Sequence, residues 1–218
     1  MLVVGQGVPG GGGHICATAT AYAAPVPLTH SVHVKARVFS GGAWSALNEA
    51  TYSVGPVAES LWISEIMYHP TDPNTEYIEL TNVGPETINL NLVRFVDGIE
   101  FAFPSIDLSP GSYVLLVQDP VAFENRYGRG LPIAGQYTGN LSNAGERIVF
   151  QDAIGTTIHD FEFDDRWYDV TDGRGFSLTV RDPATSAPDS LGQEGAWRPS
   201  ADTGGSPGFD DTGEGAAS

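Results

Sequence analysis

Turn-forming residues interrupt this sequence so often that only short strands fit between them. After residue 60, apolar stretches with a two-residue alternation are repeatedly broken by glycine, by proline or by an Asp-Gly pair. The stretches that we predict to be strands are residues 61–67, 77–82, 92–96, 99–103, 113–118, 147–151, 156–163 and 176–181. Many short strands joined by turns are typical of an antiparallel β-sandwich, so we predict an all-β fold.

One helix is expected inside this series, over residues 120–127. Asp119 stands at the N-cap position, where its carboxylate can accept the free amides of the first turn, and Pro120 follows at the first helical position. Gly128 comes directly after the last helical residue. The sequence therefore predicts a sandwich with one short helix.

Residues 1–55 are predicted to form a separate, smaller part. Residues 31–39 alternate between apolar and polar side chains, Gly41-Gly42 makes a turn, and residues 44–54 form the return strand. Two or three strands cannot bury a face of their own. We therefore predict a partial immunoglobulin- or fibronectin-like strand set over residues 1–55, a linker over 56–60, the sandwich over 61–209 and a disordered tail over 210–218.

The charge of the chain limits its partners. Lysine and arginine together number 10 against 27 aspartates and glutamates, which gives a net charge of −17. A surface of this sign repels phosphate backbones and anionic lipid headgroups, so we expect neither nucleic acid binding nor membrane insertion. Cys16 is the single cysteine, so an intrachain disulfide is excluded.

A series of short motifs follows in order after residue 60. They are ISEIMY at 63–68, EYIELTN at 76–82, INL at 88–90, LSPGSYVL at 108–115, LSNAGERI at 141–148, GRGFSL at 173–178, WRPS at 197–200 and GGSPG at 204–208. In this order the motifs resemble the lamin tail domain along nearly its whole length. The resemblance implies an immunoglobulin-like β-sandwich that serves as an interaction module.

The residues expected to carry the motif's structure are Glu65, Glu79, Asn82, Asn143, Gly145, Gly175, Ser177, Trp197, Pro207 and Gly208. Glu65 and Glu79 are expected to bond backbone or arginine groups, and Asn143 to Gly145 to form a hairpin turn. The turn at Pro207 and Gly208 would return the chain end to the sandwich, with Trp197 as a buried anchor.

A second resemblance concerns the smaller part. Residues 20–54, with VHVKARVFSGGAWSALNEATYSV at their end, are similar to the C-terminal half of a chitobiase/hexosaminidase C-terminal-like module, a repeat of large bacterial secreted proteins. Together the two resemblances imply a non-catalytic interaction, adhesion or spacer module of a larger extracellular or cell-surface protein. The expected partner is a protein or a polysaccharide, besides the neighbouring domains of the same polypeptide.

The alternative is an accessory domain of a carbohydrate-active or other hydrolase that binds sugar or calcium. Glu65, Glu76 and Glu79 would be the carboxylates of a glycosidase, but no supporting motif accompanies them. The candidate calcium ligands are Asp164, Asp165, Asp169 and Asp172, which lack EF-hand spacing, and no other cofactor is expected. Trp62, Tyr68 and Trp167 are the aromatic side chains proposed to face a sugar or a partner. A lamin-type filament protein would need heptad repeats, which this sequence does not contain.

Overall fold

The computed structural model describes residues 2–5 and 19–211. The chain divides into two compact units, Met1–Gly55 and Pro56–Ser218, and each is described by itself. Within the described residues, no helix has the length and apolar character needed to cross a membrane.

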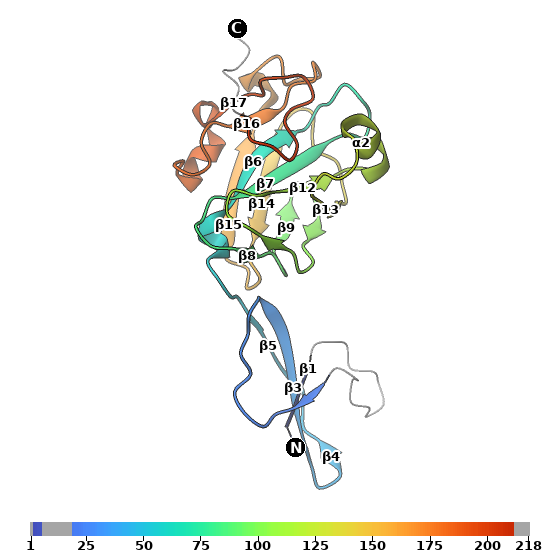
Figure 1. Ribbon diagram of the computed structural model, residues 1–218, viewed down its shortest axis with the longest axis vertical. Coiled ribbons are helices and arrows are strands. Elements are labelled where there is room, and N and C mark those ends of the chain that lie inside the picture. The colour runs from blue at the N-terminus through green and yellow to red at the C-terminus, as the bar shows by residue number, and fades with distance from the viewer. Residues whose placement is uncertain (1, 6–18, 212–218) are drawn as a thin grey trace. The chain divides into compact units, whose positions relative to one another are not determined.

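The second unit is built from two sheets (Figure 1). The larger sheet has the order β13 (Ile133–Gln136), β12 (Tyr113–Val117), β7 (Tyr77–Asn82), β6 (Leu61–Met67), β16 (Leu178–Val180) and β17 (Trp197–Pro199). The smaller sheet has the order β10 (Phe101–Ala102), β9 (Arg94–Asp97), β14 (Glu146–Gln151) and β15 (Thr157–Phe163). A short ladder joins β8 (Ile88–Asn89) to β11 (Asp107–Leu108). The helical elements are α1 (Val57–Ser60), α2 (Pro120–Tyr127) and 3₁₀ turns at Asp165–Trp167, Pro188–Gly192 and Glu194–Ala196.

The main core lies between these two sheets. Ile63, Ile66, Ile78 and Leu116 come from the six-stranded sheet, and Phe95, Ile148, Phe150 and Phe163 come from the four-stranded sheet. All of these side chains are at most 3% exposed. Alternation along each strand sends every second side chain inward, so two such faces bury each other. The prediction of an all-β, immunoglobulin-like sandwich is confirmed.

A β-bulge in β6 changes which side chains share a face. The pairing with β7 shifts between Ile63 and Glu65, so that Ser64 is an extra residue. Strict alternation predicts that Ile63 shares a face with Glu65 and Met67, and this is wrong. Ile63 belongs to the main core, whereas Met67 lies in a second cluster on the opposite face of the sheet. The bulge therefore directs both Ser64 and Glu65 to the outer face.

Helix α2, which was predicted from its capping residues, is present and covers part of that outer face. The Asp119 carboxylate accepts the amides of Val121 at 2.8 Å and Ala122 at 3.1 Å. Phe123, which is fully buried, packs there against Tyr77. The chain leaves the helix to form β13, which runs parallel to β12 and was not among the predicted strands. A crossover helix makes this parallel pairing possible within an otherwise antiparallel sheet.

Three of the boundaries that differ from those predicted have a structural cause. Residues 56–60, predicted as a linker, contain helix α1, and Val57 is 2% exposed in the main core. The strand predicted over residues 92–96 is β9, and it begins at Arg94. Leu92 has a φ of +69°, which a strand does not accommodate. The predicted tail begins two residues too early, since Asp211 bonds Arg198 and its side chain is 2% exposed. Residues 212–218 lie outside the described part.

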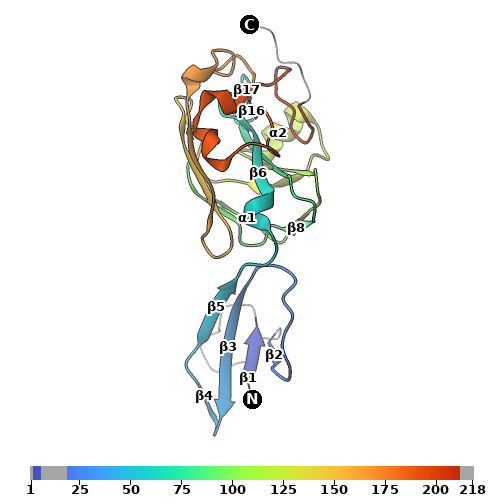
Figure 2. The same cartoon turned by 90° about the vertical axis from the view of Figure 1, so that its left-hand side faces the viewer.

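The first unit contains one antiparallel sheet (Figure 2). Its strands are β1 (Leu2–Gly5), β2 (Thr20–Ala21), β3 (Val32–Ser40), β4 (Ala43–Trp44) and β5 (Asn48–Tyr52). The predicted turn at Gly41-Gly42 is present, and its two glycines have φ angles of +58° and +81°. The described residues of this unit form no second layer, and Val38 and Tyr52 remain 44% and 48% exposed.

His159 is a buried histidine inside the sandwich unit. Its side chain is 2% exposed, and its ring contacts those of Trp62 and Phe150 at centroid distances of 4.4 and 5.2 Å. Burial lowers the pKa of His159 from 6.5 to about 4, because charging the ring there would cost desolvation. The folded protein therefore keeps this ring neutral under mildly acidic conditions.

This histidine makes the stability depend on pH. The unfolded chain binds a proton on His159 below about pH 6.5, whereas the folded chain does so only near pH 4. The free energy of unfolding should fall by roughly 3 kcal/mol as the pH drops through this window. Urea unfolding of the wild type and of His159→Leu between pH 7 and pH 4 checks this. Equal pH slopes for the two proteins would contradict it.

Candidate functional site

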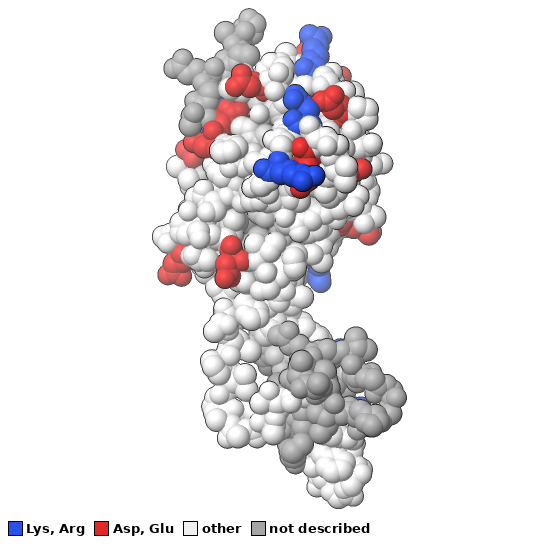
Figure 3. Space-filling view, turned by 45° about the vertical axis from the view of Figure 1, so that its right-hand side comes forward, with Lys and Arg blue, Asp and Glu red and all other residues white. Residues whose placement is uncertain are grey.

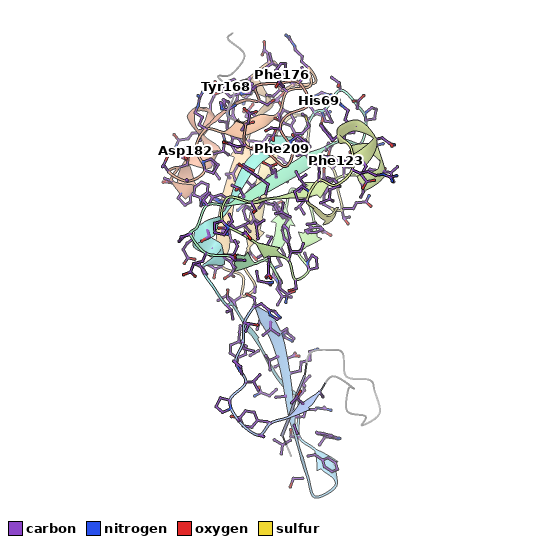
Figure 4. The ribbon with its side chains drawn as sticks, viewed as in Figure 1. His69, Phe123, Tyr168, Phe176, Asp182 and Phe209 are labelled. Carbon is purple, nitrogen blue, oxygen red and sulfur yellow. The ribbon has the colours of Figure 1, made fainter. Side chains whose placement is uncertain are left out.

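The outer face of the six-stranded sheet is closed by a segment from the end of the described chain. We call residues 200–211 the C-terminal strap. It lies in front of β6 and β7 in Figure 4, where Phe209 is labelled. It follows β17, approaches α2 at Gly204, and returns to β17 through the bond between Arg198 and Asp211. The two glutamates that the sequence singled out lie beneath it.

Glu65 holds the middle of the strap. This side chain is 1% exposed, and its carboxylate accepts the backbone amide of Ser206 at 3.0 Å and the Ser206 hydroxyl at 3.0 Å. The hydroxyl of Ser177, from the residue before β16, also donates to it. Glu65 therefore bonds backbone and hydroxyl donors and no arginine.

Glu79 holds the next part of the strap. It is 1% exposed, accepts the Gly208 amide at 2.6 Å, and accepts the Ser64 hydroxyl at 2.6 Å. Pro207, between the two bonded residues, is buried. The predicted turn thus lies against the sheet on two carboxylates.

Burial is the main cause of the raised pKa values of Glu65 and Glu79. It raises the pKa of Glu65, and it raises the pKa of Glu79 well above its usual range. The negative charge of Glu65 raises the pKa of Glu79 further, whereas the hydroxyl and amide donors lower both. The two carboxylates stabilise the strap by accepting its hydrogen bonds. Burying them in the ionised form costs free energy.

The Glu79→Gln variant separates these two effects. Its amide can accept the Gly208 N–H and donate to Ser64, while the buried charge is removed. The pKa of Glu79 is raised on folding. The stabilising contribution of Glu79 to the free energy of unfolding is therefore fully present below pH 4.5 and is lost as the pH rises. We expect the variant to unfold at a higher temperature than the wild type at pH 8 and to lose this difference at pH 4. A lower melting temperature at pH 8 would contradict this.

Two further residues position the strap and were not among the predicted site residues. Tyr77, fully buried, donates its hydroxyl to the Gly204 carbonyl at 3.2 Å. A Cβ atom on Gly205 would lie 2.0 Å from that hydroxyl and 2.2 Å from the Glu65 carboxylate. Gly205 must therefore lack a side chain, a requirement that only the packed structure reveals.

Asn82 fixes the end of β7. This fully buried amide donates to the carbonyls of Glu86 and Leu108 at 2.8 Å each and accepts the Gly84 amide at 2.9 Å. It thereby joins the turn after β7 to strand β11. Asn82 therefore ends β7 by hydrogen bonds from its side chain to the backbone.

Asn82→Ala should lower the free energy of unfolding by about 2–3 kcal/mol, because three backbone groups lose their partner and the bond to the Leu108 carbonyl is fully buried. Asn140→Ala, at an exposed asparagine, is the matched control and should stay within about 0.5 kcal/mol of the wild type. Urea unfolding followed by circular dichroism measures both. Equal losses in the two variants would contradict the assignment.

Trp197 and Gly175 act on different parts of the unit. Trp197 is fully buried in the main core, donates its indole N–H to the Leu191 carbonyl at 2.8 Å and lies tilted beside Phe161. Gly175, with a φ of +89°, accepts the Gly204 amide at 2.6 Å. Gly175 therefore bonds the strap directly, whereas Trp197 anchors β17 in the main core.

The turn at Asn143 differs from the predicted hairpin. Leu141 belongs to no strand, and residues 142–145 lead into β14, which pairs with β9 and β15. Among the three residues of the predicted turn, 143–145, only Gly145 has a positive φ angle, +84°. Its missing Cβ would lie 2.3 Å from the Phe163 carbonyl, so glycine is required by close packing against β15.

The four candidate calcium ligands are not gathered into a site. Asp164 bonds Arg166, Asp172 bonds His69 at 2.7 Å, and Asp169 is exposed. Asp165 opens the 3₁₀ turn beside them. Among the described residues, no group of three or more histidine, cysteine, aspartate or glutamate side chains could hold a metal ion.

The aromatic residues proposed as an exposed surface are largely internal. Trp62 is 6% exposed and Tyr68 is fully buried. Trp167 is partly buried against the core. The prediction failed because the bulge in β6 and the covering segments enclose residues that alternation would leave outside.

A groove of about 330 Å³ runs beside the strap. Its walls are formed by the end of β7, by β16 with residues 181–184, and by strap residues 206–211. Asp182 and Phe209, from opposite walls, are labelled in Figure 4. Ligand pockets commonly have volumes of about 300–1,000 Å³, so this groove is large enough for one side chain or a small molecule.

The comparisons with known proteins agree with the architecture. The model of the family described as Lamin Tail Domain matches residues 56–165. No curated protein and no solved structure matched the chain. The matched residues cover half of the chain and include β6, the bulge, β7 and Asn82. This chain belongs to the lamin tail domain family.

Proposed function

We propose that this chain is a non-catalytic interaction module of a larger secreted or cell-surface bacterial protein, and that it binds a protein partner. Lamin tail domains are generally non-catalytic modules. The observation that carries the proposal is the use of the buried glutamates. Glu65 and Glu79 accept bonds from the strap and from hydroxyl groups, so neither is free to act as an acid or a nucleophile on a substrate.

The first unit supports the proposal of a larger parent protein. We propose that it is the C-terminal half of a chitobiase C-terminal-like module, because its described sheet has one layer and an exposed apolar side. The apolar face of a sheet is normally buried against a second layer. Extracellular or surface location follows as part of the same proposal.

The test is direct binding of the folded, fluorescently labelled chain. Extracellular proteins and insoluble polysaccharides of a lamin-tail-encoding bacterium are fractionated, and sedimentation or anisotropy is measured against chain concentration. Saturable binding to a purified protein, with no hydrolysis of any fraction, is the expected result. Measurable turnover of a polysaccharide, or the lack of saturable binding to every protein fraction, would overturn the proposal.

Sugar binding is the alternative, and one observation favours it. A polar hollow of about 540 Å³ is lined by amide side chains, including Gln118, Gln136 and Asn140. Amides bond sugar hydroxyls well, and the side-chain amide oxygen of Gln118, Oε1, has no partner among the described residues. Saturable binding to a polysaccharide that is lost in Gln136→Ala would select this alternative.

A further inference from the structure

The groove beside the strap has the features of a site for a cationic side chain. Its volume is about 330 Å³, and it separates the strap from β16. The residues on which the inference depends are Ser64, Glu79, Tyr113, Thr179, Phe209 and Asp210. The rest of the groove contributes mainly backbone and rim residues.

The charge balance in the groove is negative. Four carboxylates line it, from Glu79, Asp182, Asp210 and Asp211, against the guanidinium groups of Arg181 and Arg198. Arg198 already bonds Asp211 at 2.8 Å, and these two side chains are 15% and 2% exposed. The balance remains negative even when Glu79 holds a proton. Figure 3 shows acidic side chains beside the point where the described chain ends.

A buried hydroxyl at the floor of this groove lacks a partner. Thr179 is 6% exposed, and its Oγ1 makes no hydrogen bond within the described part of the chain. Thr179 pairs in register with Glu65, while its neighbours Leu178 and Val180 point into the main core. Its side chain therefore points to the outer face, where the groove lies. Buried hydroxyls are nearly always bonded, so an external group is needed here.

An aromatic ring stands open at the mouth of the groove. Phe209 is 66% exposed, although large apolar side chains on a strap are normally buried. Tyr113 lies on the opposite side, and its pKa is raised to about 12 by burial and then by the negative charges of Asp210 and Glu79. A cation over an aromatic face is attracted by the ring quadrupole. The groove thus combines an acidic floor with an aromatic rim.

We propose that this groove binds the guanidinium group of an arginine side chain presented by the protein partner. The guanidinium faces Asp210 and Glu79, one of its N–H groups donates to the Thr179 hydroxyl, and the aliphatic stem lies on Phe209. Arginine fits better than lysine because its planar group offers five donors to several acceptors at once. This inference rests on the proposed function, since it names the chemistry of the partner.

The probe is a blocked tripeptide, N-acetyl-Gly-Arg-Gly-amide, titrated into the ¹⁵N-labelled full chain at 150 mM salt. We expect saturable shifts of the amides of Tyr113, Thr179 and Asp210. The peptides with lysine and with glutamine in place of arginine are the controls. The lysine peptide should bind more weakly, and the glutamine peptide should leave these amides unmoved.

Variants with opposite expected signs sharpen the test. Asp210→Asn should weaken binding by about threefold, and Arg181→Gln should strengthen it by about the same factor, as expected for exposed ion pairs. Asp189→Asn, at an exposed aspartate outside the groove, is the matched control and should change nothing. Thr179→Val keeps the shape of the side chain. It should weaken binding without lowering the melting temperature.

Equal shifts with the glutamine peptide, or equal effects of Asp189→Asn and Asp210→Asn, would overturn the assignment, because the peptide would then be sampling the overall negative charge. The two proposals fail separately. If the arginine peptide does not bind while the chain still binds an extracellular protein, the groove assignment is wrong and the proposed function stands.

Discussion

Trp197→Ala lowers the free energy of unfolding of the sandwich unit by about 3–5 kcal/mol, which is the expected cost of removing a large, fully buried side chain. Trp197 is 0% exposed, and its indole N–H is bonded to the Leu191 carbonyl at 2.8 Å. The truncation leaves a cavity beside Phe161 and an unpaired carbonyl. Urea unfolding followed by far-ultraviolet circular dichroism measures the loss.

Phe209→Ala is the matched control for this experiment. Phe209 is another aromatic residue of the same region, but it is 66% exposed. Its removal should change the free energy of unfolding by no more than about 0.5 kcal/mol. Comparable losses in the two variants would show that Trp197 is not an anchor of the main core.

Glu65→Ala is expected to cost about 3 kcal/mol and to release the strap. The variant loses the acceptor for the Ser206 amide, the Ser206 hydroxyl and the Ser177 hydroxyl. Each buried donor left unpaired costs about 1–3 kcal/mol, and the relief of removing one buried charge offsets part of this. Hydrogen exchange at the Ser206 and Gly208 amides should become faster.

Glu162→Ala provides the control, because Glu162 is an exposed carboxylate on β15. It should leave hydrogen exchange at the Ser206 and Gly208 amides unchanged. If Glu65→Ala preserves the slow exchange of the Ser206 amide, the strap is held by contacts other than this carboxylate.

Local patterns in the sequence predicted the elements whose causes are local. The N-cap of α2 at Asp119, the Gly41-Gly42 turn and the two central strands β6 and β7 follow from capping, turn chemistry and alternation. The fold class followed from the same patterns. Glu65, Glu79 and the turn at Pro207 were singled out as candidate residues because they stand in motifs with recognisable order.

Features with long-range causes were missed. The bulge at Ser64 depends on the partner strand, and the parallel strand β13 depends on the crossover made by α2. Gly205 is required by the positions of Tyr77 and Glu65, more than a hundred residues away. The groove arises from segments that meet only in the folded chain, so no sequence window could contain its signal.

The strap has a consequence for how this protein can be made. Glu65 and Glu79 leave the ribosome more than a hundred residues before the donors at residues 177 and 206–208 that bond them. Domains fold as units during synthesis, so the sheet that carries the two acids stays uncovered until the strap has been translated. A recombinant fragment of residues 56–165 lacks β16, β17 and the whole strap, so its two glutamates would stay uncovered.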